Sequence, residues 1–414
     1  MEADQPVHAA APHFAVSDNC LLVGGIPLTR LALRVGSTPF YACDRTLLTK
    51  KLHHLRGVLP ECVKIHYSLK ANPMPALVQH MSALVDGFDI ASAGEMQLAL
   101  NAGMAPEHII FSGPGKTDAE LLQALAADVT INIESTNELR RLAQMAKQCK
   151  LPNSAPRIML RINPDFRLRS SGCVMGGGAK PFGIDVEQIP AVLAELKHLP
   201  FEFAGFHIFC GSQNLNAAAI VESLTQSCEL VLELAKFCSA PVRRINLGGG
   251  FGIPYFPGER PLDIVAVTAH LNKCVERLGA RWPQLRVEIE SGRYLVGEAG
   301  VYVTRVIDKK YSRGTCFLVT DGGMHHHLAV SGNFGQVIRK NFPVAVGNKM
   351  VSSGHALATV VGPLCSPLDI IAEQMPLAHA EVGDLIVVFQ SGAYGRSASP
   401  TAFLSHPMPP EILV

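Results

Sequence analysis

The stretch VKIHYSLKANPMPALVQHMSALVDGFDIAS, at residues 63–92, places a strand, a helix and a second strand in succession. Its first run, Val63–Lys70, and its last, Phe88–Ser92, are short and rich in apolar residues, as strands are. Between them, Pro75–Val85 has apolar residues three and four positions apart, which is the spacing of an amphipathic helix. The stretch therefore predicts a strand–helix–strand unit.

The same pattern continues along the chain. Further strand-like runs are His108–Gly113, Val129–Glu134, Arg157–Asn163, Phe203–Phe209, Arg243–Leu247 and Arg286–Glu290. Helical spacing recurs at Gly94–Ala102, Thr117–Ala127, Thr136–Cys149, Val186–Leu199, Ala217–Cys238 and Leu262–Leu278. Eight strand-like runs with helical patterns between them predict an α/β fold of the (β/α)8 type, a TIM barrel. An open, doubly wound sheet is the alternative.

The pattern changes after about residue 300, where β-rich runs follow one another with few helical stretches between them. Near the start of the chain, NCLLVGGIPL (19–28) and TPFYACD (38–44) also have the composition of strands. We therefore expect a second, all-β domain of sandwich or barrel-like form, built from both chain ends. The expected limits are 1–44 for the N-terminal strands, 45–298 for the barrel and 299–414 for the C-terminal β domain.

Composition limits the class of protein. Of the 414 residues, 48% are hydrophobic and 17% charged, which is enough for a large core and excludes a disordered chain. The 36 basic and 35 acidic residues give a net charge of +1, so nothing favours a nucleic-acid or membrane partner. The N-terminus lacks a signal-peptide pattern and no long apolar run occurs, so we expect a cytoplasmic protein without membrane insertion. The 11 cysteines form no CxxC pair, which favours reduced thiols.

In a TIM barrel the active site lies at the carboxyl ends of the strands. Those ends bring together Lys70, Asp89, Arg161, His207 and Glu290. A lysine at the end of a buried strand is a potential nucleophile, although a lone lysine there often only extends to solvent. His207 could lie flat against a planar cofactor, or it could be an ordinary buried histidine.

A phosphate site is predicted after the seventh strand, where Gly248, Gly249 and Gly250 leave successive backbone N–H groups free to surround an anion. Arg293 could bind a phosphate or carboxylate, and Glu290 could hold a proton on a heterocyclic nitrogen; a local ion pair between them is the alternative. A lysine that forms an imine, a phosphate site and an acid for a ring nitrogen together indicate pyridoxal 5'-phosphate as the cofactor.

At these motifs the sequence resembles the fold-type III pyridoxal-phosphate-dependent decarboxylases, which include the ornithine, arginine and diaminopimelate decarboxylases. The resemblance covers essentially the whole chain. Within the family it is most similar to the decarboxylases associated with exosortase A systems, and that branch resembles a butirosin-pathway enzyme that acts on a glutamyl group held on an acyl carrier protein. The family resemblance rests on YSLKAN (67–72), His207, Gly248–Gly250, Glu290–Arg293, GPLC (362–365) and GAY (392–394). The closer similarity rests on FSGPGK (111–116), GFHIFCGSQNL (205–215), INLGGGFGIPYFPGE (245–259), SGRYLVGEAGVYV (291–303) and DGGMHHHLAVSGNFGQVIRKNFP (321–343).

The resemblance implies a role for each motif residue. Lys70 forms the imine with the cofactor, His207 stacks on its ring and Glu290 pairs with the ring nitrogen. Cys365 comes from the partner subunit of a homodimer and returns a proton to the substrate carbon. The implied cofactor-binding set is Lys70, Asp89, Arg161, His207, Ser212, Gly248, Gly249, Gly250, Glu290, Gly292, Arg293 and Tyr394. The expected substrate-binding set is Arg293, His325, His326, Ser366, Asp369 and Tyr394.

The sequence departs from the family pattern after Cys365. Diamine-forming and diaminopimelate enzymes usually have an acidic residue there, which binds the distal amine of the substrate, whereas this chain has Ser366. Asp369 is the nearest possible substitute. The expected reaction is therefore decarboxylation of an amino acid that is either free or tethered to an acyl carrier protein. Candidate charges for docking an acidic carrier are Arg167, Arg169, Lys180, Arg339 and Lys340.

The sequence leaves alternatives for the function and for two of its motifs. An amino-acid racemase of the same fold and a non-catalytic cofactor-binding protein are the rival functions. Three adjacent histidines, His325–His327, rarely converge on one metal because neighbours on an extended chain alternate faces, so no metal site is expected. The glycine-rich stretch Ser171–Gly183 is either a mobile loop that closes over substrate or an ordinary long loop.

Overall fold

A computed structural model of the chain describes residues 7–9, 13–148, 155–168 and 172–414. They form two compact units. The barrel unit comprises Leu52–Gly252 and Leu262–Gly292, and the sheet unit comprises Met1–Lys51, Ile253–Pro261 and Arg293–Val414. Helix α2 (Arg45–Val58) carries the chain from the sheet unit into the barrel unit.

The strands of the barrel unit close into a ring of parallel neighbours, in the order β9-β12-β14-β15-β5-β6-β7-β8. Pairing of β8 with β9 closes the ring, which confirms the barrel and excludes the open sheet. The strands are β5 (Val63–Ser68), β6 (Gly87–Ile90), β7 (Ile109–Phe111), β8 (Thr130–Ile133), β9 (Arg157–Asn163), β12 (Glu202–Ile208), β14 (Arg244–Gly249) and β15 (Arg286–Ser291). A short strand, β11 (Ile184–Asp185), adds to β9.

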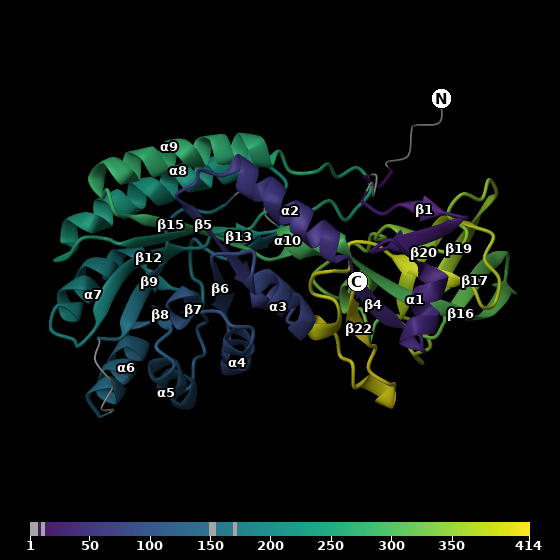
Figure 1. The fold of residues 1–414 in the computed structure, drawn as a ribbon, viewed down its shortest axis with the longest axis horizontal. Helices are drawn as coiled ribbons and strands as arrows, with labels where there is room; N and C mark the ends of the chain where they lie inside the picture. Colours follow the sequence, from purple (N-terminus) through teal and green to yellow (C-terminus); the bar gives the residue numbers. More distant parts are fainter. Residues whose placement is uncertain (1–6, 10–12, 149–154, 169–171) are drawn as a thin grey trace. The chain divides into compact units, whose positions relative to one another are not determined.

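Helices lie on the outside of this ring of strands (Figure 1). They are α3 (Pro75–Ser82), α4 (Ala93–Asn101), α5 (Asp118–Ala126), α6 (Thr136–Gln148), α7 (Ile189–Leu196), α8 (Ala217–Leu234) and α9 (Ile264–Arg281). Local sequence fixes where several begin. Thr117 and Glu120 form a capping box before α5, and the Ser135 hydroxyl accepts the Glu138 N–H at the start of α6.

The sheet unit contains a mixed sheet in the order β18-β21-β16-β17-β19-β20. An N-terminal strand, β4 (Phe40–Cys43), pairs with β16 on one side and with the C-terminal strand β22 on the other. The unit is therefore built from both chain ends, as expected. The remaining strands are β16 (Gly300–Ser312), β17 (Thr315–Thr320), β18 (Val344–Val346), β19 (His355–Val361), β20 (Ile370–Ala378), β21 (Leu385–Val388) and β22 (Glu411–Leu413).

The N-terminal segment also contributes a small sheet and a helix that the strand-like composition did not indicate. Strands β1 (Val16–Ser17), β2 (Cys20–Val23) and β3 (Ile26–Pro27) lead into helix α1 (Leu28–Val35), which ends at Gly36 in a left-handed conformation. Helix α1 buries Leu28 and Leu31 in a core shared with Phe40 and with strands β16 and β21. Burial of this apolar face, rather than local propensity, stabilises so short a helix.

Among the described residues, no helix combines the length and the apolar composition needed to cross a membrane.

Candidate active site

A chain of buried polar side chains crosses the barrel interior at the carboxyl ends of its strands. Ser112 donates its hydroxyl proton to Oδ1 of Asp89 (2.9 Å), and Nδ2 of Asn132 lies 3.2 Å from the Ser112 oxygen. Asn132 Nδ2 also contacts Nδ1 of His207. The other ring nitrogen of His207, Nε2, lies 2.9 Å from Oε1 of Glu290. The chain therefore links β6 to β15 through residues on β8 and β12.

The electrostatics of Glu290 favour an ionised carboxylate. Burial alone would raise its pKa, but the contact with His207 and the charges of Lys70 and Arg161 lower it below its ordinary value. Asn246, on β14, donates from Nδ2 to the same Oε1 (2.9 Å). By contrast, burial and the nearby charge of Glu290 raise the pKa of Asp89 well above its ordinary value. Glu290 is therefore the fixed negative charge of the site.

Lys70 is exposed at the end of β5, within the short 3-10 turn Leu69–Ala71. Its Nζ lies 5.8 Å from the centre of the Phe209 ring. Its charge contributes to lowering the pKa of both Asp89 and Glu290, so the amine lies near both carboxyl groups. The position suits an amine that must reach a bound molecule.

The glycines after β14 are required by the geometry of the backbone. Gly248 and Gly250 adopt positive φ angles of 67° and 74°. A Cβ on Gly249 would lie 1.8 Å from the Glu290 carbonyl oxygen, and one on Gly250 would lie 2.0 Å from that of Gly211. This loop therefore packs its backbone directly against β15 and the Gly211–Ser212 strand, which only glycine allows. Glycines also leave the backbone N–H groups uncovered by side chains, as an anion-binding loop requires.

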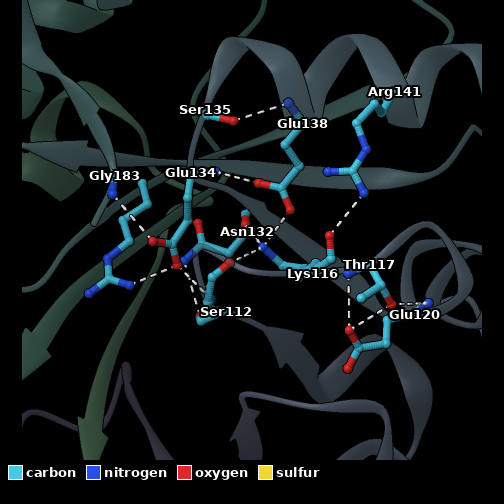
Figure 2. A network of polar contacts seen from close by, with 12 residues as sticks. Ser112, Lys116, Thr117, Glu120, Asn132, Glu134, Ser135, Glu138, Arg141 and Gly183 are labelled. Carbon is cyan, nitrogen blue, oxygen red and sulfur yellow. Dashed lines mark hydrogen bonds and ion pairs between the residues drawn. The ribbon is translucent and has the colours of Figure 1, made fainter. Parts of the chain in front are cut away.

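Figure 2 shows a second polar network, around Lys116 and Glu138, which meets the first at Asn132. Lys116 is only 5% exposed and donates to the carbonyl oxygens of Gly113 (2.7 Å) and Asn132 (2.9 Å) and to Glu138 (2.6 Å). All three ammonium protons therefore have acceptors. A buried, paired lysine of this kind stabilises structure and is not poised as a nucleophile.

Arg161 is held by the same network. Its Nη1 lies 2.7 Å from Oε1 of Glu134, and that oxygen also accepts the Gly113 N–H. Burial would raise the pKa of Glu134, but Arg161 and Lys116 lower it below its ordinary value. The guanidinium also lies 5.1 Å from the Phe182 ring centre. The structure thus gives Arg161 a supporting position on β9, ion-paired and buried.

In the sheet unit, Arg293 and Tyr394 lie together. The Arg293 guanidinium carbon is 4.5 Å from the centre of the Tyr394 ring, and Arg293 Nη1 donates to the Tyr255 hydroxyl (2.9 Å). Aromatic side chains thus hold the guanidinium in a defined orientation. Gly292, at the edge of the barrel unit, packs so closely that a Cβ would lie 2.9 Å from that of Ala71.

Cys365 is exposed in the loop between β19 and β20, and Ser366 is half-buried beside it. Asp369 is 2% exposed, and its carboxylate accepts backbone N–H groups from Met324 (2.6 Å) and Leu364 (2.9 Å). One carboxylate oxygen therefore binds within the Cys365 loop, at Leu364, and the other binds the turn that contains Met324.

The three histidines are buried in the sheet unit. His327 donates or accepts through Nε2 with the Ser391 hydroxyl (3.0 Å), and His326 Nε2 lies 2.9 Å from the Pro407 carbonyl oxygen. His325 packs between His326 and His406, with ring centres 3.6 and 4.8 Å away. Within the described ranges, no group of three His, Cys, Asp or Glu side chains is arranged to hold a metal ion.

The glycine-rich stretch is described from residue 172 onward, so Ser171 lies outside the described residues. Cys173–Val174 pairs with Gly211–Ser212, and Met175 and Gly176 donate to the Cys210 carbonyl oxygen. Asn163 binds Gly177 and Gly178 through its side-chain amide. This stretch therefore has defined hydrogen bonds to the ends of the fifth and sixth barrel strands.

Three of the polar site residues, Ser112, Asn132 and Asn246, were not predicted from the sequence. Asn132 alternates with Thr130 on β8, and Asn246 with Arg244 on β14, so each strand turns two polar residues to the barrel interior. A polar residue at every second position of an otherwise apolar strand was the available signal.

Comparison with known proteins places these observations in a family. Residues 45–297 match the family model described as "Pyridoxal-dependent decarboxylase, pyridoxal binding domain". The chain is 40% identical over 382 residues to the L-glutamyl-[BtrI acyl-carrier protein] decarboxylase of Niallia circulans, covering 91% of this chain and 88% of that protein. It is 31% identical over 380 residues to the 2-[(L-alanin-3-ylcarbamoyl)methyl]-2-hydroxybutanedioate decarboxylase of Staphylococcus aureus, covering 89% and 92%. The structure of diaminopimelate decarboxylase from Helicobacter pylori complexed with L-lysine superimposes with a TM-score of 0.82 at 26% identity, covering 93% and 94%.

The fold and site define an enzyme that uses pyridoxal 5'-phosphate to decarboxylate amino acids. The chain belongs to the family of pyridoxal-dependent decarboxylases, which includes the diaminopimelate decarboxylases. Its residues fit the cofactor, because the barrel offers an exposed lysine, an ionised glutamate and a glycine cradle too tight for any side chain. A decarboxylase is thus favoured over the racemase and the non-catalytic protein.

Proposed function

We propose that this enzyme decarboxylates an amino acid that is attached through its distal end to an acyl carrier protein. The observation that carries the proposal is the loop after Cys365, where Ser366 replaces the usual acid and the Asp369 carboxylate is bound by two backbone N–H groups. A free diamino acid needs a negative charge for its distal ammonium. A substrate whose distal group forms a thioester or an amide carries no such charge.

The similar proteins support this direction. The Niallia circulans decarboxylase acts on a glutamyl group of an acyl carrier protein, and the Staphylococcus aureus decarboxylase acts on an alanine unit joined through a carbamoyl group to a larger acid. Neither name describes a substrate with a free distal ammonium on the reacting unit. The basic residues proposed to dock the carrier remain predictions. Arg167 and Lys340 are exposed, and Arg169 lies outside the described residues. Arg339 contacts Glu373 and Asn341.

Each barrel residue has a proposed task in the reaction. Bound pyridoxal phosphate supplies an electron sink for the electrons that remain when carbon dioxide leaves. Lys70 would hold the cofactor through its amine, and the ionised Glu290 would keep a proton at the cofactor's ring nitrogen. His207 would lie against the cofactor ring, and Gly249, Gly250 and Ser212 would hold its phosphate.

The proposed tasks of the sheet unit are proton return and substrate binding. The exposed thiol of Cys365 gives a proton to the substrate carbon, and Arg293 and Tyr394 bind anionic oxygens. We also propose a homodimer in which a partner copy supplies Cys365, a cytoplasmic location and membership of the branch associated with exosortase A systems. Mixing Lys70→Ala and Cys365→Ala variants tests the shared site. Recovery of up to about a quarter of the wild-type activity supports it, and no recovery contradicts it.

The experiment for the substrate compares free and carrier-bound amino acids at equal concentration by mass spectrometry. We expect loss of carbon dioxide from a carrier-bound aminoacyl group and much slower turnover of free diaminopimelate, ornithine and lysine. Efficient turnover of the free diamino acids, without any turnover of carrier-bound substrates, contradicts the proposal. Ser366→Asp should raise activity toward free diamino acids, and Ser366→Asn is the neutral control of matched size.

A further inference from the structure

In the row of polar side chains that crosses the barrel, the donor and the acceptor of each hydrogen bond can be assigned by counting the available protons. Ser112 has a single hydroxyl proton, and the geometry gives it to Oδ1 of Asp89. The Ser112 oxygen can therefore only accept from Asn132, whose Nδ2 lies 3.2 Å away. This holds whether Asp89 is ionised or carries a proton on its other oxygen, because Oδ1 accepts in both states.

The assignment continues to His207. The Asn132 amide group that faces Ser112 must be the NH₂ group, since its carbonyl oxygen has no proton to give. The same Nδ2 faces Nδ1 of His207, so its second N–H is donated to that nitrogen. Nδ1 must then be unprotonated, and the proton of a neutral imidazole lies on Nε2, which is 2.9 Å from Glu290.

We propose that Asn132 is a positioning residue that fixes the tautomer of His207, and that Ser112 fixes the orientation of Asn132. The pair keeps an Nε2–H beside the Glu290 carboxylate and prevents a proton from settling on Nδ1. This account rests on the proposed role of Glu290, but it concerns a different property, namely the location of one proton on His207.

Burial makes the arrangement rigid. Asn132 is completely buried on β8, His207 is 2% exposed, and Ser112 and Asp89 are also buried. Burial shields the amide from bulk water, so reversal of the amide would leave Ser112 facing an oxygen and would cost at least one hydrogen bond. Titratable groups near these polar side chains include His66, Lys70, Asp89, Arg161 and Glu290, and Lys116 donates to the Asn132 carbonyl oxygen. Among the described residues, Asn132 is the only amide that contacts Nδ1 of His207.

The test measures the ring nitrogens of His207 directly. Protein labelled with ¹⁵N-histidine is studied by NMR with and without cofactor, and the His207 signals are assigned by their disappearance in His207→Gln. We expect the wild-type Nδ1 to resonate as an unprotonated nitrogen and Nε2 as a protonated one. Asn132→Asp, which is isosteric but can only accept at that position, should move Nδ1 to the protonated position.

Ser112→Ala keeps Asn132 but removes the group that orients it. We expect this milder variant to give a mixture of the two tautomers, with retained cofactor absorbance and a loss of about 10-fold in kcat at little change in KM, as for other groups that orient a functional ligand. Ser135→Ala is the matched control, because Ser135 caps helix α6 and is not one of the polar side chains that link Asp89 to Glu290. A protonated Nδ1 in the wild type, or an unchanged His207 spectrum in Asn132→Asp, overturns the proposal, whether or not the enzyme accepts carrier-bound substrates.

Discussion

At the scale of single residues, the barrel contains two lysines near the site with opposite properties. Lys70 is exposed, whereas Lys116 is buried and donates to three acceptors. Sequence reasoning identified Lys70, because it ends an apolar strand. Lys116 was not predicted to have a structural role, because no local sequence pattern shows that it forms an ion pair with Glu138 on helix α6.

Lys116→Met tests the structural role of this pair. Removal of the ammonium leaves Glu138 and two carbonyl groups buried without their donor, so the free energy of unfolding should fall by about 3–5 kcal/mol. Urea unfolding of the barrel measures the change. Arg140→Met, which breaks an exposed pair with Glu195, serves as the control and should leave the unfolding curve nearly unchanged. An equal, small effect for both variants contradicts the structural role.

At the scale of elements, the strands of the barrel were predictable to within about two residues, because alternating strand and helix patterns repeat eight times. Helix α1 was not predicted, although Leu28, Leu31 and Ala32 have helical spacing before Gly36. The helix was missed because the residues before and after it have the composition of strands. The inward polar residues of β8 and β14 were missed for a different reason: their partners come from strands far away in the sequence.

The glycine loop after β14 offers a test at this scale. Gly250→Ala forces a side chain into a positive φ and onto the Gly211 carbonyl oxygen, so cofactor binding should weaken by roughly tenfold or more. Fluorescence titration of the cofactor-free protein with pyridoxal phosphate measures this. Gly279→Ala, in helix α9 where a Cβ meets nothing within 4 Å, is the matched control and should keep wild-type affinity. Equal affinity of the two variants contradicts the assigned cradle.

The buried histidine segment gives a pH prediction. Burial lowers the pKa of His327 to about 3, against an ordinary value near 6.5. The unfolded chain therefore binds more protons below pH 6.5, and the stability that this residue supports above that pH is lost as the pH falls toward 3. The slope is up to about 1.4 kcal/mol per pH unit. The free energy of unfolding, measured between pH 7.5 and 5, should depend less on pH in His327→Gln than in the wild type. His198→Gln changes an exposed histidine and is the control. An unchanged slope in His327→Gln contradicts the prediction.

At the scale of the whole molecule, the sequence predicted a barrel and a β-rich unit made from both chain ends, and the pairing of β4 with β16 and β22 confirms the latter. What it could not predict is how the loop after Cys365 uses its one carboxylate. Asp369 is three positions from Ser366, and only the folded chain shows that it binds the backbone of Met324 and Leu364. These contacts occupy both oxygens of the Asp369 carboxylate with backbone N–H groups.

We propose that this decarboxylase holds its cofactor on the exposed Lys70, and that the buried Lys116 of the same barrel is structural. The most direct measurement is borohydride reduction of the cofactor-loaded enzyme, which fixes the cofactor covalently to the lysine that holds it, followed by peptide mapping. The account predicts that the label lies on Lys70 and that Lys70→Ala remains unlabelled. A label on Lys116 or on another lysine, or undiminished labelling of Lys70→Ala, contradicts it.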